Sequence, residues 1–218
     1  MTRTSARLTI TLLIFLISII HAIFYVHNKG SAQQQSNVTD VAHQDAQKLH
    51  LSIPNASWEP IFFKSLETRI KQINLPSLRA IVLPNKDDLE VRFWIDLLPS
   101  RLDGVILRRL NNEWSAIRIQ GTSERQGFPL SQKQLAVPKS GWDGAWKKLL
   151  GAGVMTLPDA SEVNCNVIMI DGLAFVIETN FNWSYRTYAY GNPQIAKCNE
   201  AKQIISIAQI IFDEFALV

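Results

Sequence analysis

Histidine is missing from most of the sequence. The four histidines of this 218-residue chain are His21, His27, His43 and His50, so none follows residue 50. Without an imidazole, a Ser-His-Asp or Cys-His nucleophilic site cannot form in the rest of the chain. The same absence excludes His-containing zinc sites and the iron site built from two His and one carboxylate. Carboxylates are therefore the remaining candidates for catalysis.

Cysteine is almost as scarce. Cys165 and Cys198 are the only two, too few to complete a structural zinc site and too far apart for a Cys-x-x-Cys redox pair. The sequence also has no Walker loop and no G-x-G-x-x-G after an expected strand. We therefore expect neither a metal nor another cofactor. In an exported domain the simplest interpretation of two cysteines is a disulfide, with two free buried thiols as the alternative.

After residue 50 the sequence has almost no excess of basic over acidic residues. Of 22 Lys and Arg, four precede residue 51, as do two of the 19 Asp and Glu, so the remainder is nearly neutral. A nucleic-acid-binding surface needs clustered Lys and Arg to neutralise phosphates. The best candidates, which alternate with other residues on an expected solvated hairpin, are Arg101, Arg108, Arg109, Arg118 and Arg125. No nucleic-acid partner is expected.

The N-terminus does contain one long apolar run. Leu8 to Val26 spans 19 residues, enough for a helix across a bilayer core of about 30 Å. Arg3 and Arg7 precede the run, which keeps the N-terminus in the cytoplasm and exports the rest. The run is either an uncleaved membrane anchor or a signal peptide cleaved near Ala32.

The chain therefore divides into three parts. Residues 1–27 form the transmembrane anchor or signal peptide, and residues 28–50, rich in small and polar residues, form a flexible tether. Residues 51–218 form a single exported domain. An uncleaved anchor holds this domain in the periplasm or its equivalent, as a single-pass protein of the cytoplasmic membrane. Cleavage would release it as a secreted protein.

The first part of the domain predicts a helix followed by an antiparallel meander. Ser57 can cap a helix whose apolar positions recur at helical spacing, namely Phe62, Leu66, Ile70 and Ile73. Strand-like segments with short turns between them, which favour antiparallel neighbours, follow at 78–83, 89–97, 104–110 and 114–120. Alternate residues of "LEVRFWIDLL" are apolar. One face of that strand should meet the core, and the other should face water or a partner.

The second part predicts helices around another antiparallel unit. Residues 121–141 look irregular, and Ser140 then caps a helix with an apolar stripe of Trp142, Trp146, Leu149 and Leu150. Asp171 and Gly172 suit a type I′ turn between strands at 167–170 and 173–177. A strand at 185–190 leads through Asn192, as an N-cap, into a final helix whose buried face is Ile204, Ile207, Ala208, Ile211 and Phe215. The predicted fold class is α+β, with antiparallel strands covered by helices on one face.

Aromatic residues concentrate in "WSYRTYAYGNP", Trp183 to Pro193. Strand alternation puts Arg186, Tyr188 and Tyr190 on one side of the predicted strand. Aromatics on a strand are first of all sheet formers. The alternative is a binding face, because Tyr and Arg are common interface anchors. Trp94 and the loop at 120–140 are outlying binding candidates.

Asp159, Asp171 and Glu178 are the candidate catalytic residues. Two carboxylates with different pKa values can hydrolyse a glycoside. Each of the three also has a structural explanation: Asp159 lies in a Pro-Asp corner, Asp171 lies in the predicted turn, and Glu178 can pair with Arg186 across the hairpin. The sequence favours a non-enzymatic protein and leaves catalysis open.

Three motifs of the C-terminal half carry a resemblance. "GWDGAWKKLLGAGVMTLPDAS", "MIDGLAFVIETNFNWSYRTYAYGNP" and "CNEAKQIISIAQIIFDEF" join a Trp-bearing helix, a "TLPD" loop, a "DG" hairpin, a "YRxYxYxNP" strand exit and a final helix. This pattern, over Gly141 to Phe215, resembles a family of uncharacterised exported or lipid-anchored bacterial proteins. The resemblance implies an envelope location and no activity, so it assigns no catalytic residue.

The leading hypothesis is a membrane-tethered binding or interaction module with a protein partner in the cell envelope. One alternative is a carboxylate-dependent hydrolase of an envelope polysaccharide, and another is a structural subunit that pairs with a second chain through a strand edge. Two acids about 5–10 Å apart in a cleft would support the hydrolase. An aromatic patch would support the binding module.

Overall fold

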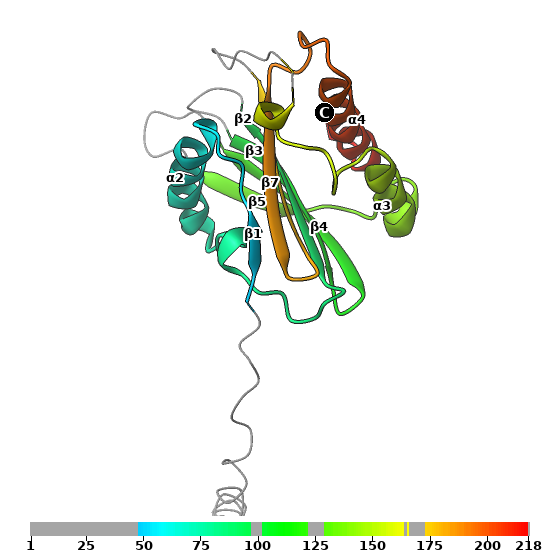
Figure 1. Ribbon diagram of the computed structural model, residues 1–218. Coiled ribbons are helices and arrows are strands. Elements are labelled where there is room, and N and C mark those ends of the chain that lie inside the picture. Colours follow the sequence, from blue (N-terminus) through cyan, green and yellow to red (C-terminus); the bar gives the residue numbers. More distant parts are fainter. Residues whose placement is uncertain (1–47, 97–101, 122–128, 164, 166–172, 218) are drawn as a thin grey trace, which may run out of the picture. The chain divides into compact units, whose positions relative to one another are not determined.

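The computed structural model describes residues 48–96, 102–121, 129–163, 165 and 173–217 (Figure 1). Gln47–Val218 forms one compact unit. The expected anchor at Leu8 to Val26 and the expected turn at Asp171 and Gly172 lie outside the described residues. Within the described ranges, no helix combines the length and the hydropathy needed to span a bilayer.

A seven-stranded mixed sheet forms the centre of this unit. Its strand order is β1-β7-β6-β2-β3-β4-β5. β1 is parallel to β7, and the other neighbouring pairs are antiparallel. The strands are β1 (His50–Ser52), β2 (Leu89–Asp96), β3 (Leu102–Leu110), β4 (Glu113–Gly121), β5 (Leu130–Gln134), β6 (Ala174–Phe181) and β7 (Ser184–Gly191). The predicted meander is confirmed for β2, β3 and β4, and β1 makes the sheet mixed.

Helices cover both faces of the sheet. α2 (Trp58–Ile70) packs on one face, while α3 (Gly141–Gly151) and α4 (Asn199–Glu214) pack on the other (Figure 1). Short 3-10 helices in the connections are η1 (Lys71–Ile73), η2 (Leu78–Ala80) and η3 (Ala160–Glu162). The α+β prediction is confirmed, but the prediction of helices on one face is wrong. α2 covers the second face of β2 although that face carries Glu90 and Arg92, both of which are buried.

Each face has its own hydrophobic core. The core beneath α3 and α4 includes Val91, Phe93, Leu107, Ile177, Ile204, Ile207 and Ile211. The core beneath α2 includes Phe63, Leu66, Ile70, Trp94, Ile106, Ile119 and Val176. Side chains alternate along a strand, so successive residues of β2 enter opposite cores. The predicted buried face of α4 is confirmed for Ile204, Ile207, Ala208 and Ile211.

Two segments of the first half differ from the prediction. Residues 78–83 do not form a strand: after η2, the Ile81 carbonyl accepts from Asn180 Nδ2 at 2.8 Å, and the Leu83 carbonyl accepts from Trp183 Nε1 at 3.1 Å. Side chains of the β6–β7 hairpin thus donate the hydrogen bonds that a neighbouring strand would otherwise supply. Conversely, β5 lies within residues 121–141, which were expected to be irregular. Its polar sequence, LSQKQ, lacks the apolar alternation that indicates a strand.

The approach to α4 also differs. The helix begins at Asn199, and its N-cap is Cys198 rather than Asn192. Asn192 has a φ of 47°, in the left-handed region, and its N–H donates to the Leu173 carbonyl at 2.7 Å. A turn therefore follows β7 before the helix starts. The β6–β7 hairpin itself turns on two residues, Asn182 and Trp183, with φ of 52° and 55°.

Candidate functional site

The predicted binding residues of β7 hold a neighbouring loop in place. Tyr188 and Tyr190 are fully buried, and burial raises the pKa of both hydroxyls. Their hydroxyls and the guanidinium of Arg186 donate to the carbonyl oxygens of Val154, Met155, Leu157 and Pro158. These three side chains do share one side of β7 as predicted, but they fasten residues 154–158 to the sheet. Residues 154–158 cover Tyr188 and Tyr190, and the role of these three side chains as a binding face stays a prediction.

Trp94 is enclosed as well. Its side chain is fully buried beneath α2, and its Nε1 donates to Glu178 Oε2 at 2.7 Å. Gly104 on β3 leaves room for the ring, since a Cβ there would lie 2.4 Å from Trp94 Cε3. Trp94 therefore belongs to the core beneath α2, and its role as a binding residue stays a prediction.

Glu178 lies on the face of the sheet beneath α2. It is fully buried, and its second oxygen accepts from the Tyr185 hydroxyl at 3.0 Å. The expected pair with Arg186 does not form, because the register places Arg186 opposite Thr179, on the other face. Burial raises the pKa of Glu178 above its usual value and outweighs the opposing effects of Arg92 and the two hydrogen bonds.

Replacing Glu178 with Gln is expected to make stability less dependent on pH. With a raised pKa, the folded protein keeps a proton that the unfolded chain releases near pH 4.5. Stability therefore falls as pH rises from the unfolded pKa through the folded one, by about 1.4 kcal/mol for each pKa unit between them. Urea unfolding from about pH 4 to about pH 8 should show wild type losing stability relative to Glu178→Gln. Parallel pH profiles would contradict this expectation.

Asp159 joins the start of η3 to β7. One carboxylate oxygen accepts from the N–H and the hydroxyl of Ser161, and the other accepts from the Ala189 N–H at 2.8 Å on the outer edge of β7. An open hollow of about 490 Å³ lies beside it. Among the described lining residues, Asp159 is the acidic one, the others being Ala56, Ser57, Trp58, Ala160, Ser161, Val163, Cys165, Ala189 and Gly191. A hydrolase of the expected kind needs a second acid there, and Glu178 is instead buried beneath α2.

Charged residues on the strand face that was expected to meet water or a partner are buried beneath α2. Arg92 has no exposed side-chain area, and its Nε lies 2.6 Å from Glu90 Oε1. Arg108 on β3 approaches the other oxygen of Glu90 at 2.7 Å. Burial alone would raise the pKa of Glu90, but the two guanidiniums hold it below its usual value. These residues form a structural ion cluster.

The two cysteines form the predicted disulfide. Cys165 and Cys198 are bonded, with their Cα atoms 5.5 Å apart. Cys198 is also the N-cap of α4, and its Sγ accepts from the Ala201 N–H at 3.3 Å. The bond therefore ties the start of α4 to the segment that precedes β6.

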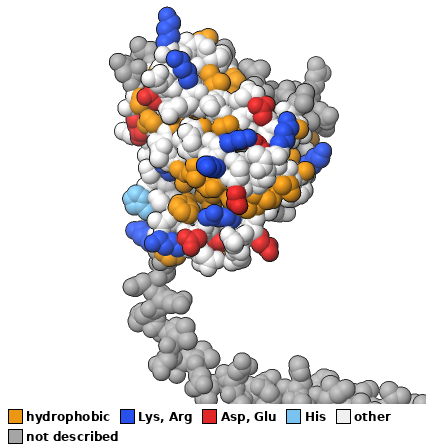
Figure 2. Space-filling model, turned by 90° about the vertical axis from the view of Figure 1, so that its right-hand side faces the viewer, with side chains coloured by type: hydrophobic (Ala, Val, Ile, Leu, Met, Phe, Trp, Pro, Cys, Tyr) orange, Lys and Arg blue, Asp and Glu red, His pale blue; other side chains and the backbone are white. Residues whose placement is uncertain are grey.

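An aromatic surface on the α3 side is the best candidate site. Its members, which we call the tryptophan surface, are Trp114, Trp142, Trp146 and Phe215, all partly exposed. The rings of Trp114 and Trp142 are nearly parallel, 6° apart, with centroids separated by 6.2 Å. Trp146 lies 5.9 Å from Trp114, and Phe215 lies 6.2 Å from Trp142. Figure 2 shows hydrophobic side chains gathered across the face that carries α3 and α4.

Three elements build the tryptophan surface. Trp142 and Trp146 are four residues apart on α3, so they share one side of the helix. Trp114 stands on β4 beneath the guanidinium of Arg109, 5.3 Å from the ring centroid. The sequence indicated the pair on α3 as a core-facing stripe and gave no sign that Trp114 joins it. The apolar side of α3 extends to Leu150, whose side chain is 47% exposed.

Polar contacts fix α3 against the end of α4. Glu214 is buried; it accepts from Lys148 Nζ at 2.5 Å and from the Ser140 N–H at 2.8 Å. The hydrogen bond from Lys148 lowers the pKa of Glu214. Phe215 directly follows Glu214 in the chain. The contacts of Glu214 with α3 therefore also hold the ring of Phe215 beside that of Trp142.

Comparison with protein-family models and with curated protein sequences gives no match to this chain.

Proposed function

We propose that the protein is a non-enzymatic binding module of the cell envelope, tethered to the outer side of a cytoplasmic membrane. Its partner is a protein that docks on the tryptophan surface. The observation that carries the proposal is the gathering of three of the six tryptophans of the chain on one partly exposed surface. Contiguous exposed apolar patches mark interaction sites in soluble domains.

The chemistry of the tryptophan surface suits a protein partner. Trp is the residue most enriched among interface hot spots, because it buries a large area and loses little conformational freedom. The contacts of Glu214 with α3 hold these rings before any partner arrives, which reduces the entropy lost on binding. The guanidinium of Arg109 adds a polar group at the rim.

The two alternative functions receive less support. The described candidate acids, Asp159 and Glu178, lie in separate environments, and both have their oxygens engaged by hydrogen bonds. For strand pairing, the edge strand β1 has three residues, and beyond it the Ala189 N–H of β7 already donates to the Asp159 carboxylate. The β5 edge is short and exposes Ser131, Gln132, Lys133 and Gln134, and short polar edges resist strand addition.

Replacing Trp142 with Ala is expected to weaken partner binding by about 30-fold or more, as for a hot-spot Trp worth at least about 2 kcal/mol. Tagged full-length protein is used to capture partners from solubilised envelope, and the captured partner is then titrated against each variant. Ile61→Ala is the matched control, because Ile61 is 71% exposed on α2, on the opposite side of the sheet. Equal affinity of Trp142→Ala and wild type, or an equal loss in Ile61→Ala, would contradict the proposal. Urea unfolding of each variant checks that it is folded.

A further inference from the structure

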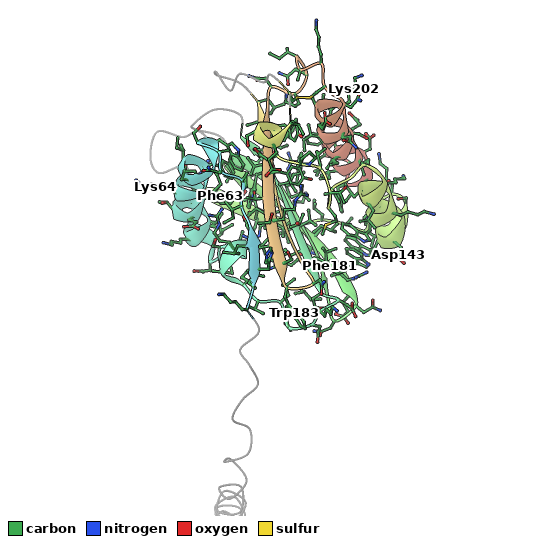
Figure 3. The ribbon with its side chains drawn as sticks, in the orientation of Figure 1. Phe63, Lys64, Asp143, Phe181, Trp183 and Lys202 are labelled. Carbon is green, nitrogen blue, oxygen red and sulfur yellow. A yellow bond between two sulfur atoms is a disulfide. The ribbon has the colours of Figure 1, made fainter. Side chains whose placement is uncertain are left out.

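A second apolar surface lies at the end of the domain where β1 begins. Its members, which we call the tip surface, are Leu51, Val82, Phe181 and Trp183. Leu51 is 49% exposed, Val82 43% and Phe181 36%, and Trp183 is partly exposed. Figure 3 labels Phe181 and Trp183 at the turn of the β6–β7 hairpin, at the end of the sheet from which β1 starts.

Hydrogen bonds of Trp183 bring these residues together. Its carbonyl oxygen accepts from the His50 N–H at 2.9 Å, beside Leu51. Its indole Nε1 donates to the Leu83 carbonyl at 3.1 Å, beside Val82. One side chain and its backbone thus join three segments that are far apart in the sequence.

The backbone of Trp183 is unusual for a tryptophan. Its φ is 55° and that of Asn182 is 52°, so both residues of the turn are left-handed. Two-residue turns of this kind favour Asn followed by Gly, and a large L-residue has a steric cost in that conformation. A bulky aromatic therefore occupies the position where Gly would fit best. Such an outlier points to a role for the side chain beyond the turn.

The chain that enters the domain here favours a lipid partner. The apolar run ends at Val26 and β1 begins at His50, so the 23 residues 27–49 join them. Fully extended, a chain of that length reaches about 80 Å, and a random coil of that length spans about 25–30 Å. An anchor in the bilayer would therefore keep the tip surface at a high local concentration of lipid.

The tip surface and its neighbours suit the headgroup region of a bilayer. Trp is enriched at membrane interfaces, where its ring is apolar and its N–H is polar. Lys48 and Lys86 are exposed on the two segments beside the tip surface, and Lys is attracted to anionic headgroups. Asp87, exposed next to Lys86, offsets one of these two charges.

We propose that the tip surface docks on the membrane that holds the anchor, with Phe181 and Trp183 at the boundary between headgroups and acyl chains. This inference rests on the proposed membrane tether and adds a second contact with the same bilayer. The strands of the sheet then point away from the lipid. The tryptophan surface, on the flank of the sheet, stays open to a protein partner.

Fluorescence quenching by brominated lipid tests the proposal. All six tryptophans lie between residues 58 and 183, outside the expected anchor. The full chain is reconstituted into vesicles of phosphatidylcholine and phosphatidylglycerol, with or without bromine on the acyl chains. We expect quenching in wild type and a quenched fraction at least about twofold smaller in Trp183→Phe, because an interfacial indole is within reach of the bromines. Trp142→Phe, the matched control on α3, should be quenched like wild type.

Each failure has a separate meaning. Protein that does not float with the vesicles in a density gradient contradicts the membrane tether, and with it the proposed function. Protein that floats but shows the same quenched fraction in wild type and Trp183→Phe overturns the tip contact alone. Phe181→Asp is a second variant at an exposed position: the charge should reduce the quenching of Trp183, and unchanged quenching would count against docking.

Discussion

Replacing Glu90 with Gln is expected to lower the free energy of unfolding by about 3–5 kcal/mol, the range for removing one partner of a buried ion pair. Arg92 has no exposed side-chain area and lies 2.6 Å from Glu90. In the Gln variant the guanidinium keeps its hydrogen bond to the Pro76 carbonyl at 2.9 Å, and the amide oxygen of Gln still accepts from it but carries no negative charge. The charge then remains in the interior without its ion-pair partner, and Glu178, opposite Arg92 in the sheet, is a poor substitute because burial raises the pKa of its carboxyl.

Equilibrium unfolding in urea, followed by far-UV circular dichroism, measures this effect. Asp213→Asn is the control, because Asp213 is exposed on α4 and contacts the side chain of Gln209 at the surface, so the change should cost about 0.5 kcal/mol or less. The double variant Glu90→Leu, Arg92→Leu removes both charges and should recover most of the loss, since apolar replacements of buried pairs are often neutral. A loss under about 1 kcal/mol in Glu90→Gln would show that Arg92 does not depend on this carboxylate.

Removing the disulfide is expected to cost about 3–4 kcal/mol in the chain-entropy model. The bond joins residues 33 positions apart, so its loss frees a long loop in the unfolded chain. The suitable variant is Cys165→Ala, Cys198→Ser. Because Cys198 caps α4 through its sulfur, Ser at that position supplies an oxygen for the same N–H and keeps the two effects separate.

Urea unfolding with and without dithiothreitol provides the comparison. Wild type should shift to lower urea on reduction, and the double variant should unfold near the reduced wild type whether or not reductant is present. Equal midpoints for oxidised wild type and the double variant would mean that the bond does not contribute to equilibrium stability.

Patterns set by neighbouring residues were sufficient to predict part of the fold. The meander of β2, β3 and β4 follows from apolar alternation and short turns, and the buried face of α4 follows from its helical spacing. The disulfide was predicted from two facts, a pair of cysteines and an expected export signal. In each case the relevant physical preference lies within one segment or in the composition of the chain.

Features that depend on tertiary contacts were not predicted. Glu90 and Arg92 look solvent-exposed along β2, and only the register with β3 brings Arg108 to the same carboxylate. Residues 78–83 look like a strand, but side chains of Asn180 and Trp183 take their carbonyls instead. The local sequence pattern does not show which hydrogen-bond and ion-pair partners the rest of the fold will supply.

In the candidate site, too, local features were predicted and tertiary contacts were not. The common side of Arg186, Tyr188 and Tyr190 was predicted correctly, whereas the loop that covers them was not, because its sequence gives no sign of where it packs. Trp142 and Trp146 share a helix face by spacing. Their contact with Trp114 depends on how α3 lies across β4, which periodicity cannot show.

Three residue pairs, from His50 with Ser184 to Ser52 with Arg186, hold the start of the domain to β7. A force applied to the chain before His50 along the strand axis would slide β1 past β7 instead of lifting it away. The hydrogen bonds of the three pairs would then stretch together and share the force, whereas a strand pulled sideways loses its bonds one at a time. A strand of three residues can therefore act as a mechanical clamp that protects the sheet from tension applied to the chain before His50.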